Sequence, residues 1–156
     1  SSIEGAKEIN SLCVANPDVY YFSIANYKTK IDEDSGYHKP MKGMSNILKV
    51  QARLMGRKKA YYSDGTSTDS TWYLNDGVVN TVSMLGPTTG SSGPDPITEF
   101  RQGDLVIPGQ WYVMGNYEFD HSALIGHQMR KDEYSSLKKI YLNQLRILWS
   151  LPNWLQ

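Results

Sequence analysis

The sequence predicts an α/β fold with a parallel sheet, and two neighbouring segments near its start lead to this prediction. In residues 4–15 apolar side chains recur at helical spacing up to Asn16-Pro17, and Ser1 stands three residues before Glu4, as in a capping box. After a short turn, residues 19–25 form a run of β-branched and aromatic side chains that suits a buried strand. A helix, a short turn and a buried strand in this order make up half of a βαβ unit, whose strands run parallel.

Residues 26–70 show no regular hydrophobic pattern. Two polar turns interrupt them, at residues 32–36 and 63–67, and loops of this length usually carry function or lie over a surface. Between the turns, residues 44–55 contain several apolar side chains: Ile47, Leu48, Val50 and Leu54. Their spacing fits a helix and a partly buried strand, so both interpretations stay open.

Two apolar runs, residues 72–74 and 78–82, flank Asn75-Asp76-Gly77, and the segment is typical of two strands around a tight turn. Taken alone, such an Asn-Asp-Gly triplet is most often a hairpin turn selected for positive φ. Residues 86–96 are rich in Gly, Pro and Ser, which predicts a loop. We place no domain boundary there, because the flanking halves are too small to fold separately.

The end of the chain predicts one more strand and one long helix. Residues 110–119 are rich in aromatic and β-branched side chains, and Asp120-His121 ends the predicted strand. The helix is capped at Ser135 or Ser136 and stopped by Pro152. Its apolar residues recur on one face: Leu137, Ile140, Tyr141, Leu145 and Leu148.

Composition excludes several classes of function. Sixteen basic and sixteen acidic residues leave no net charge, so nucleic acid and anionic membrane surfaces are not expected partners. The single cysteine, Cys13, excludes an internal disulfide framework. No apolar run approaches the roughly 20 residues that span a bilayer, and residues 1–20 lack the pattern of a signal peptide.

Asp76 and His121 become informative when they are seen with their surroundings. The stretches around them, with three shorter matches in the same order, resemble the staphylococcal and thermophilic Bacillus triacylglycerol lipases over about residues 2–148. The matching segments are 72–87 with Gly90-Ser91-Ser92, 111–121 with Ile125-Gly126, Glu4-Gly5-Ala6, 20–23 and Gly43-Met44.

The resemblance implies a fold and a pair of catalytic residues. Residues 1–156 would form the C-terminal part of a single α/β-hydrolase domain, with a mostly parallel sheet flanked by helices, in a secreted enzyme that hydrolyses acylglycerol esters. The acid of the Ser-His-Asp triad falls on Asp76 and the base on His121. The order acid, then histidine, agrees with the chain order of α/β-hydrolases, and a carboxylate on one imidazole nitrogen would fix the tautomer of the base.

The sequence departs from these lipases at the nucleophile. It contains no Gly-x-Ser-x-Gly motif, since Gly90-Ser91-Ser92-Gly93 has the wrong spacing and Gly43-Met44-Ser45 lacks the closing glycine. Ser122 adjoins His121 and cannot easily face its ring. We therefore expect the serine on the N-terminal half of the lipase, as a separate chain or an upstream segment, because half a sheet alone would expose an unpaired edge.

Metal binding is a second departure. The related lipases bind calcium through a carbonyl that falls near Gly43 and through acidic residues that fall on Ala123 and Gln128, so two carboxylates are lost and we expect no calcium there. Zinc ligands of these lipases fall outside this sequence, so zinc stays unknown. Residues 32–36 are expected to be a solvated turn rather than a calcium loop. The remaining histidines, His38 and His127, are expected at the surface without metal.

An alternative function is a non-catalytic binding or structural module that kept the hydrolase fold. It would need no serine partner and would cleave no ester.

Overall fold

The computed structural model of the chain describes residues 2–87, 95, 97–127 and 129–152. Several sequence-based expectations lie outside these residues. They are the cap at Ser1, most of the loop at 86–96, the lipase match at Gly90-Ser91-Ser92, and Gln128, on which an acidic residue of the related lipases falls.

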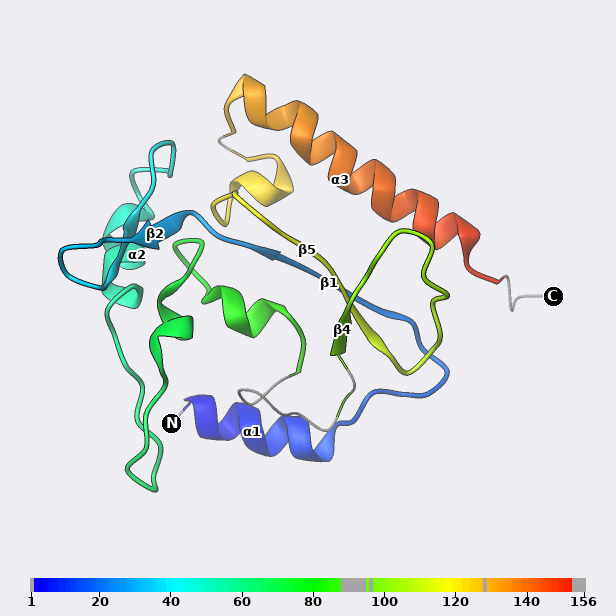
Figure 1. Cartoon of the computed structure of the whole chain (residues 1–156), viewed down its shortest axis with the longest axis horizontal. Helices are drawn as coiled ribbons and strands as arrows, with labels where there is room; N and C mark the ends of the chain where they lie inside the picture. The colour runs from blue at the N-terminus through cyan, green and yellow to red at the C-terminus, as the bar shows by residue number, and fades with distance from the viewer. Residues whose placement is uncertain (1, 88–94, 96, 128, 153–156) are drawn as a thin grey trace.

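A three-stranded parallel sheet lies at the centre of the molecule, in the order β1-β5-β4 (Figure 1). β1 spans Tyr21–Asn26, β5 spans Trp111–Tyr117 and β4 spans Ile97–Glu99. Both β1 and β4 pair with β5 in the parallel sense. The predicted α/β fold and the strands predicted at residues 19–25 and 110–119 are confirmed, and β4 is an additional strand that the sequence pattern did not indicate.

The pairing of β1 with β5 contains an irregularity close to the ends of the strands. Ser23 lies opposite Val113, but Ala25 lies opposite Asn116, so β5 carries one residue more than β1 between these pairs. Gly115 lies in this bulge with a φ of 147°, where a Cβ atom would come within 2.7 Å of the ring of Tyr117. Bulges of this kind bend a strand and redirect the residues that follow, which here are the residues leading to His121.

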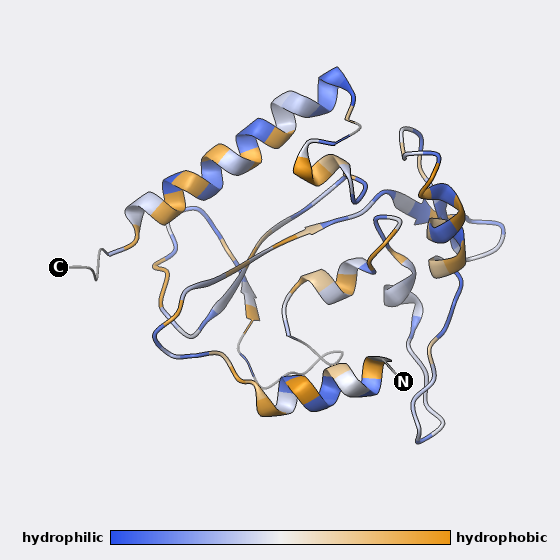
Figure 2. Ribbon diagram, turned by 180° about the vertical axis from the view of Figure 1, so that it is seen from behind, coloured by the Kyte–Doolittle hydropathy of each residue, from blue (hydrophilic) through white to orange (hydrophobic). Residues whose placement is uncertain are grey.

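Two long helices lie on opposite sides of the sheet (Figures 1 and 2). α1 spans Ser2–Leu12 and α3 spans Lys131–Ser150, ending before Pro152 as predicted. The expected start of α3 at Ser135 or Ser136 is wrong. The helix begins one turn earlier because the carboxylate of Glu133 accepts a hydrogen bond from the backbone N–H of Arg130, at 3.1 Å, and so satisfies a donor that a helix start leaves free.

A small hydrophobic core lies between α3 and the chain that follows β5. Phe119, Ala123 and Leu137 are buried against one another. Tyr141, Leu145 and Leu148, which were expected on the buried face, are exposed instead. The apolar stripe of α3 is therefore only partly covered within the described part of the chain (Figure 2).

The irregular segment at residues 27–69 contains two short strands and one short helix. β2 (Thr29–Ile31) and β3 (His38–Pro40) form an antiparallel pair, and α2 spans Lys49–Met55. The helix resolves the alternative that the sequence left open for residues 44–55. None of the helices among the described residues is long and apolar enough to cross a membrane.

The hairpin interpretation of residues 72–82 is wrong. Two 3₁₀ helices flank the turn, η1 at Ser70–Tyr73 and η2 at Thr81–Met84, and only an isolated bridge joins Asn75 to Asn80. The side chain of Asp69 caps η1 by accepting a hydrogen bond from the N–H of Thr71 at 2.9 Å. The apolar runs that resemble strands in sequence are thus largely part of these short helices and of the turn itself.

Candidate active site

Asp76 and His121 are in direct contact. His121 Nδ1 lies 2.8 Å from Asp76 Oδ2, although the two residues are 45 positions apart in the chain. A main-chain hydrogen bond from the N–H of His121 to the carbonyl of Asp76, at 3.1 Å, joins the same two residues a second time. The contact that the sequence interpretation required is therefore present, and the catalytic roles of the two residues stay a prediction.

The two members of the pair differ in exposure. The side chain of Asp76 is fully buried, whereas 49% of the His121 side chain is exposed. An ionised carboxylate only accepts hydrogen bonds, so Nδ1 carries the proton of this contact, and in the neutral imidazole Nε2 then has the lone pair. Among the described residues, Nε2 has no hydrogen-bond partner. The arrangement therefore presents a basic ring nitrogen on a ring that is fixed from its buried side.

The carboxylate of Asp76 is held at both oxygens. Oδ1 accepts hydrogen bonds from the backbone N–H groups of Val78 and Val79, at 2.8 and 2.7 Å. Oδ2 accepts from Nδ2 of Asn26, at 3.2 Å, as well as from His121. These bonds satisfy a buried negative charge that would otherwise be strongly unfavourable.

The turn that carries Asp76 is fixed to the end of β1. The carbonyl of Asn75 accepts hydrogen bonds from the N–H of Lys28 at 2.9 Å and from Thr29 Oγ1 at 3.1 Å. The side chain of Asn75 is buried and bonds to the N–H of Gly77 at 3.0 Å. Gly77 has a φ of 101°, and a Cβ atom there would lie 2.8 Å from the Cβ atom of Leu48. The positive φ predicted for this turn is therefore real, although the turn closes no hairpin.

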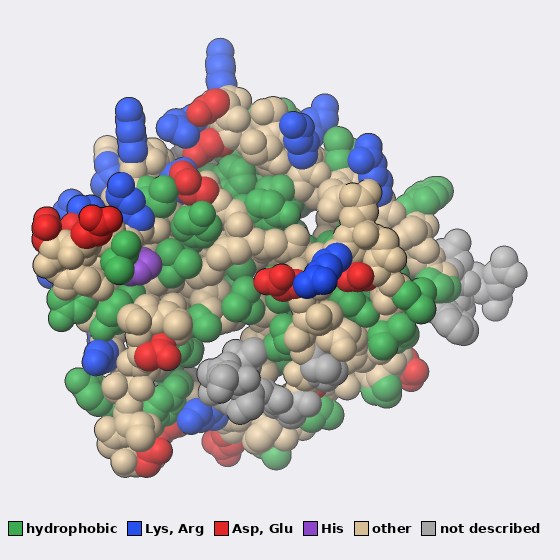
Figure 3. All heavy atoms as spheres, viewed as in Figure 1, with side chains coloured by type: hydrophobic (Ala, Val, Ile, Leu, Met, Phe, Trp, Pro, Cys, Tyr) green, Lys and Arg blue, Asp and Glu red, His purple; other side chains and the backbone are tan. Residues whose placement is uncertain are grey.

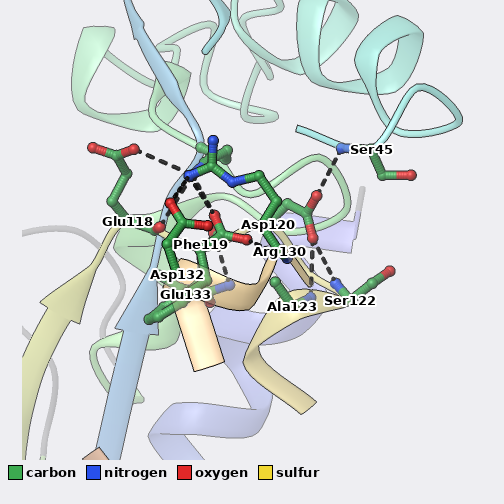
Figure 4. A network of polar contacts seen from close by, with 11 residues as sticks. Ser45, Glu118, Phe119, Asp120, Ser122, Ala123, Arg130, Asp132 and Glu133 are labelled. Carbon is green, nitrogen blue, oxygen red and sulfur yellow. Dashed lines mark hydrogen bonds and ion pairs between the residues drawn. The ribbon is translucent and has the colours of Figure 1, made fainter. Parts of the chain in front are cut away.

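Asp120 holds the segment that carries His121. One of its oxygens accepts hydrogen bonds from the N–H groups of Ser122 and Ala123, at 3.2 and 3.0 Å. The other accepts from the N–H of Ser45 at 2.8 Å. Figure 4 shows this side chain between the two segments. Asp120 thus starts the 3₁₀ helix η3 (Ala123–Ile125) and ties it to a loop 75 residues earlier.

A buried lysine joins the same region to α3. Lys28 is only 2% exposed, and its Nζ lies 3.0 Å from Oε1 of Glu133 and 3.2 Å from Oε1 of Glu118. The carboxylates of Glu118 and Glu133 lie near one another in Figure 4. Burial alone would raise the pKa of Glu133, but the hydrogen bonds from the Arg130 backbone and from Lys28 outweigh it and hold that pKa below its usual value.

The positions onto which the sequence resemblance places calcium ligands have surroundings that differ from a cation site. Ala123 is buried in the hydrophobic core, and the guanidinium of Arg130 lies against Gly43, 3.1 Å from where a Cβ atom of that residue would stand. Among the described residues no group of three or more His, Cys, Asp or Glu side chains could hold a metal ion.

The other two histidines have different environments. His127 is exposed, as expected. His38 is half-buried, with a buried Nδ1 atom that has no hydrogen-bond partner, and its burial lowers its pKa. The expectation of a surface position is therefore wrong for His38, because the ring packs near Tyr73.

Three residues of this region were missed by the sequence analysis: Asn26, Lys28 and Asp120. Of the three, Asn26 gave the clearest signal in the sequence. It is a polar residue at the carboxyl end of a buried strand, where the functional sites of parallel sheets usually lie. Lys28 gave no signal of its own. Asp120 was noted only as the residue that ends a strand.

The match to solved structures is extensive. No family model matches the sequence. EstA from Clostridium botulinum matches 88% of the chain with a TM-score of 0.71 and 36% identity. Lipase 1 from Pelosinus fermentans matches 96% with a TM-score of 0.66 and 25% identity. Staphylococcus hyicus lipase matches 95% with a TM-score of 0.66 and 21% identity, a likeness of fold alone.

The chain has the fold of bacterial lipases. The resemblance indicated by the sequence is thereby confirmed, together with the parallel sheet flanked by helices. The matched region is 33% of the EstA chain and 37% of each of the two lipases, so this chain spans about a third of the length of these lipase-fold proteins.

Proposed function

We propose that the chain is the C-terminal part of a secreted serine lipase that hydrolyses acylglycerol esters, with Asp76 as the acid and His121 as the base of a Ser-His-Asp triad. The observation that carries the proposal is the 2.8 Å contact between His121 Nδ1 and a fully buried aspartate. The lipase fold supports it, and so does the match of the sequence around both residues to staphylococcal and Bacillus lipases.

In this mechanism His121 acts twice. Its Nε2 takes the proton of the serine hydroxyl while the serine oxygen attacks the ester carbonyl, and then gives that proton to the departing alkoxide. A water molecule, deprotonated by the same nitrogen, then attacks the acyl-enzyme; the acyl C–O bond breaks, Nε2 returns the proton to the serine oxygen, and the fatty acid leaves. Asp76 keeps the proton on Nδ1 and stabilises the imidazolium that forms in each half of the reaction.

The nucleophilic serine lies outside this sequence, and we propose that the N-terminal part of the same lipase supplies it, as a separate chain or as an upstream segment. Within the described part of the chain, β1 and β4 are the edge strands of a three-stranded sheet, and unpaired edges are usually covered in proteins. Large apolar side chains are also exposed, including Leu12, Ile47, Leu105, Ile125 and Trp149. Figure 3 shows hydrophobic side chains in several patches on one face.

We further propose that the reaction needs no metal and that calcium does not bind beside Gly43. The guanidinium of Arg130, which pairs with Asp132 and Glu133, occupies the space next to Gly43, and Ala123 offers no carboxylate there. Whether zinc binds elsewhere in the complete lipase is a question for residues outside this sequence.

The alternative is a non-catalytic module with a lipase fold. It is favoured by one observation, which is that the sequence contains no Gly-x-Ser-x-Gly motif. Intact-mass analysis of the purified protein after treatment with a fluorophosphonate separates the two functions. The lipase proposal expects a covalent adduct on a serine outside this sequence, whether on a second polypeptide or on a longer chain. Protein that consists of this sequence alone, forms no adduct and cleaves no ester would establish the module instead.

A further inference from the structure

We infer that Asn26 is a positioning residue for the Asp76–His121 pair, a role that rests on the proposed function. Asn26 is the last residue of β1 and is 3% exposed. Its side chain bonds to the acid itself and to the segment that leads to the histidine, so it sets the position of one relative to the other.

The geometry identifies which group of Asn26 faces the pair. Nδ2 lies 3.2 Å from Asp76 Oδ2 and 3.3 Å from the carbonyl oxygen of Phe119. Both of these atoms are acceptors, so the amide NH₂ and not the amide oxygen must point toward them. An NH₂ group has two protons, one for each acceptor. The carboxamide therefore bridges the turn of Asp76 and the main chain two residues before His121.

The main chain of Asn26 is itself fixed. Its carbonyl accepts a hydrogen bond from Thr81 Oγ1 at 2.9 Å, and the residue pairs with Tyr117 of β5. Side chain and main chain thus connect β1, η2, the acid and the histidine segment at one buried point. A carboxamide at this point has little freedom to follow a displaced carboxylate.

This bridge matters because of the oxygen that it contacts. Oδ1 of Asp76 is fixed by two backbone N–H groups, whereas the donors to Oδ2 among the described residues are His121 and Asn26. With both oxygens fixed, the carboxylate group cannot rotate. The hydrogen bond from His121 Nδ1 to Oδ2 therefore has a single direction. Displacements of about 1 Å in a catalytic group can cost about 10²-fold in rate.

The neutral character of asparagine also suits the position. A lysine or arginine here would form an ion pair with Asp76 and compete with the imidazolium for its charge. Lys28, two residues further along the chain, instead forms ion pairs through its ammonium group with Glu118 and Glu133. Asn26 can therefore orient the carboxylate and leave its charge to His121.

The test compares Asn26→Ala with Ser23→Ala in the complete lipase. Ser23 lies on the same strand, is also buried, and donates a hydrogen bond to the carbonyl of Leu85 at 2.8 Å, away from the pair. Each variant loses buried hydrogen bonding from β1, but only Asn26→Ala removes a donor from Asp76 Oδ2, which then keeps His121. Turnover of a short-chain ester, the melting temperature and the NMR resonance of the His121 Nδ1 proton are measured for both.

We expect Asn26→Ala to lower kcat by about 10- to 100-fold with KM within about twofold of the parent, and to shift or broaden the Nδ1 proton resonance. Ser23→Ala should lower only the melting temperature. Asn26→Ser, whose hydroxyl can donate to one acceptor at a time, should fall between the parent and Asn26→Ala, and it serves in place of the alanine variant if that one does not fold.

The positioning role is overturned if kcat and the Nδ1 proton resonance of the folded Asn26 variants equal those of the parent, or if Ser23→Ala lowers kcat as much as Asn26→Ala. His121→Ala is assayed in parallel. Turnover that survives in His121→Ala rejects the proposed function, and the proton resonance then decides by itself whether Asn26 orients the pair.

Discussion

The carboxylate of Asp76 combines a buried charge with a complete set of hydrogen-bond donors. Two backbone N–H groups, Asn26 and His121 occupy its oxygens, and solvent has no access to it. A surface turn would need none of these contacts. The arrangement is therefore better explained by the orientation of the imidazole than by the local needs of an Asn-Asp-Gly turn.

Asp76→Asn tests this orientation with little change in shape. An asparagine can turn its NH₂ toward His121, which then has to place its proton on Nε2 and loses the lone pair that accepts the serine proton. We expect kcat for ester hydrolysis to fall by about 10⁴-fold, with the fold retained by circular dichroism. A loss smaller than about tenfold in a folded variant would show that Asp76 is not the acid.

At this scale the sequence predicts the two members of the pair but not the residues that hold them. Asp76 and His121 lie within stretches that match a known family. Asn26, Asp120 and Lys28 reach partners 50, 75 and 90 residues away. A polar residue in a single sequence carries no sign of such a distant partner, so these contacts could not be predicted.

At the scale of the elements, the first turn of α3 is joined to the sheet by charge. Lys28 is buried between Glu133, which is 11% exposed, and the more exposed Glu118. The lysine follows β1, Glu118 follows β5, and Glu133 lies on α3. One ammonium group thus connects both strands that approach the candidate site to the helix that covers the core.

Lys28→Met should destabilise the fold, because the largely buried carboxylate of Glu133 loses the nearer of its two cations and keeps the more exposed Arg130, at 3.4 Å. Removing one partner of a buried ion pair costs about 3 kcal/mol, which urea denaturation at neutral pH can measure. Lys39→Met is the matched control, since Lys39 pairs with Asp32 at the surface and should leave the midpoint almost unchanged. Equal midpoints for the two variants would contradict the structural role of Lys28.

Glu133 should also contribute to the pH dependence of stability. Its pKa in the folded chain is below the ordinary value of 4.5, so its stabilising contribution is complete above about pH 4.5 and is lost as the pH falls through the folded pKa. Glu133→Gln should therefore be less stable than the parent at pH 7, and the difference in unfolding free energy should shrink below about pH 4.5. A difference that is independent of pH would show that the charge of Glu133 is not responsible.

The elements themselves were predicted unevenly, for physical reasons. β1, β5 and the body of α3 have long apolar patterns, and the sequence predicts them. β4 has three residues and exists through its pairing with β5. The start of α3 depends on Glu133 and the backbone of Arg130, whereas the serines at 135 and 136 resemble better caps in sequence. The two 3₁₀ helices around Asp76 have the composition of strands.

At the scale of the whole molecule, the sheet and the core formed by the described residues are small. Three strands and a few buried side chains leave apolar residues of both long helices exposed, among them Ile9, Leu12, Leu145 and Trp149. The likeness to lipase-fold proteins extends over nearly the whole of this chain but about a third of theirs. Both observations support the proposal that the chain functions together with the remainder of a lipase domain.

Hydrolysis of a short-chain ester by the complete lipase and by its His121→Ala variant is the most direct measurement of the central claim, that this chain supplies the base of a serine esterase. Because Nε2 of His121 is the only group proposed to move the proton of the serine, kcat should fall by at least about 10³-fold while the melting temperature stays close to that of the parent. Undiminished turnover in a folded His121→Ala variant would contradict the account.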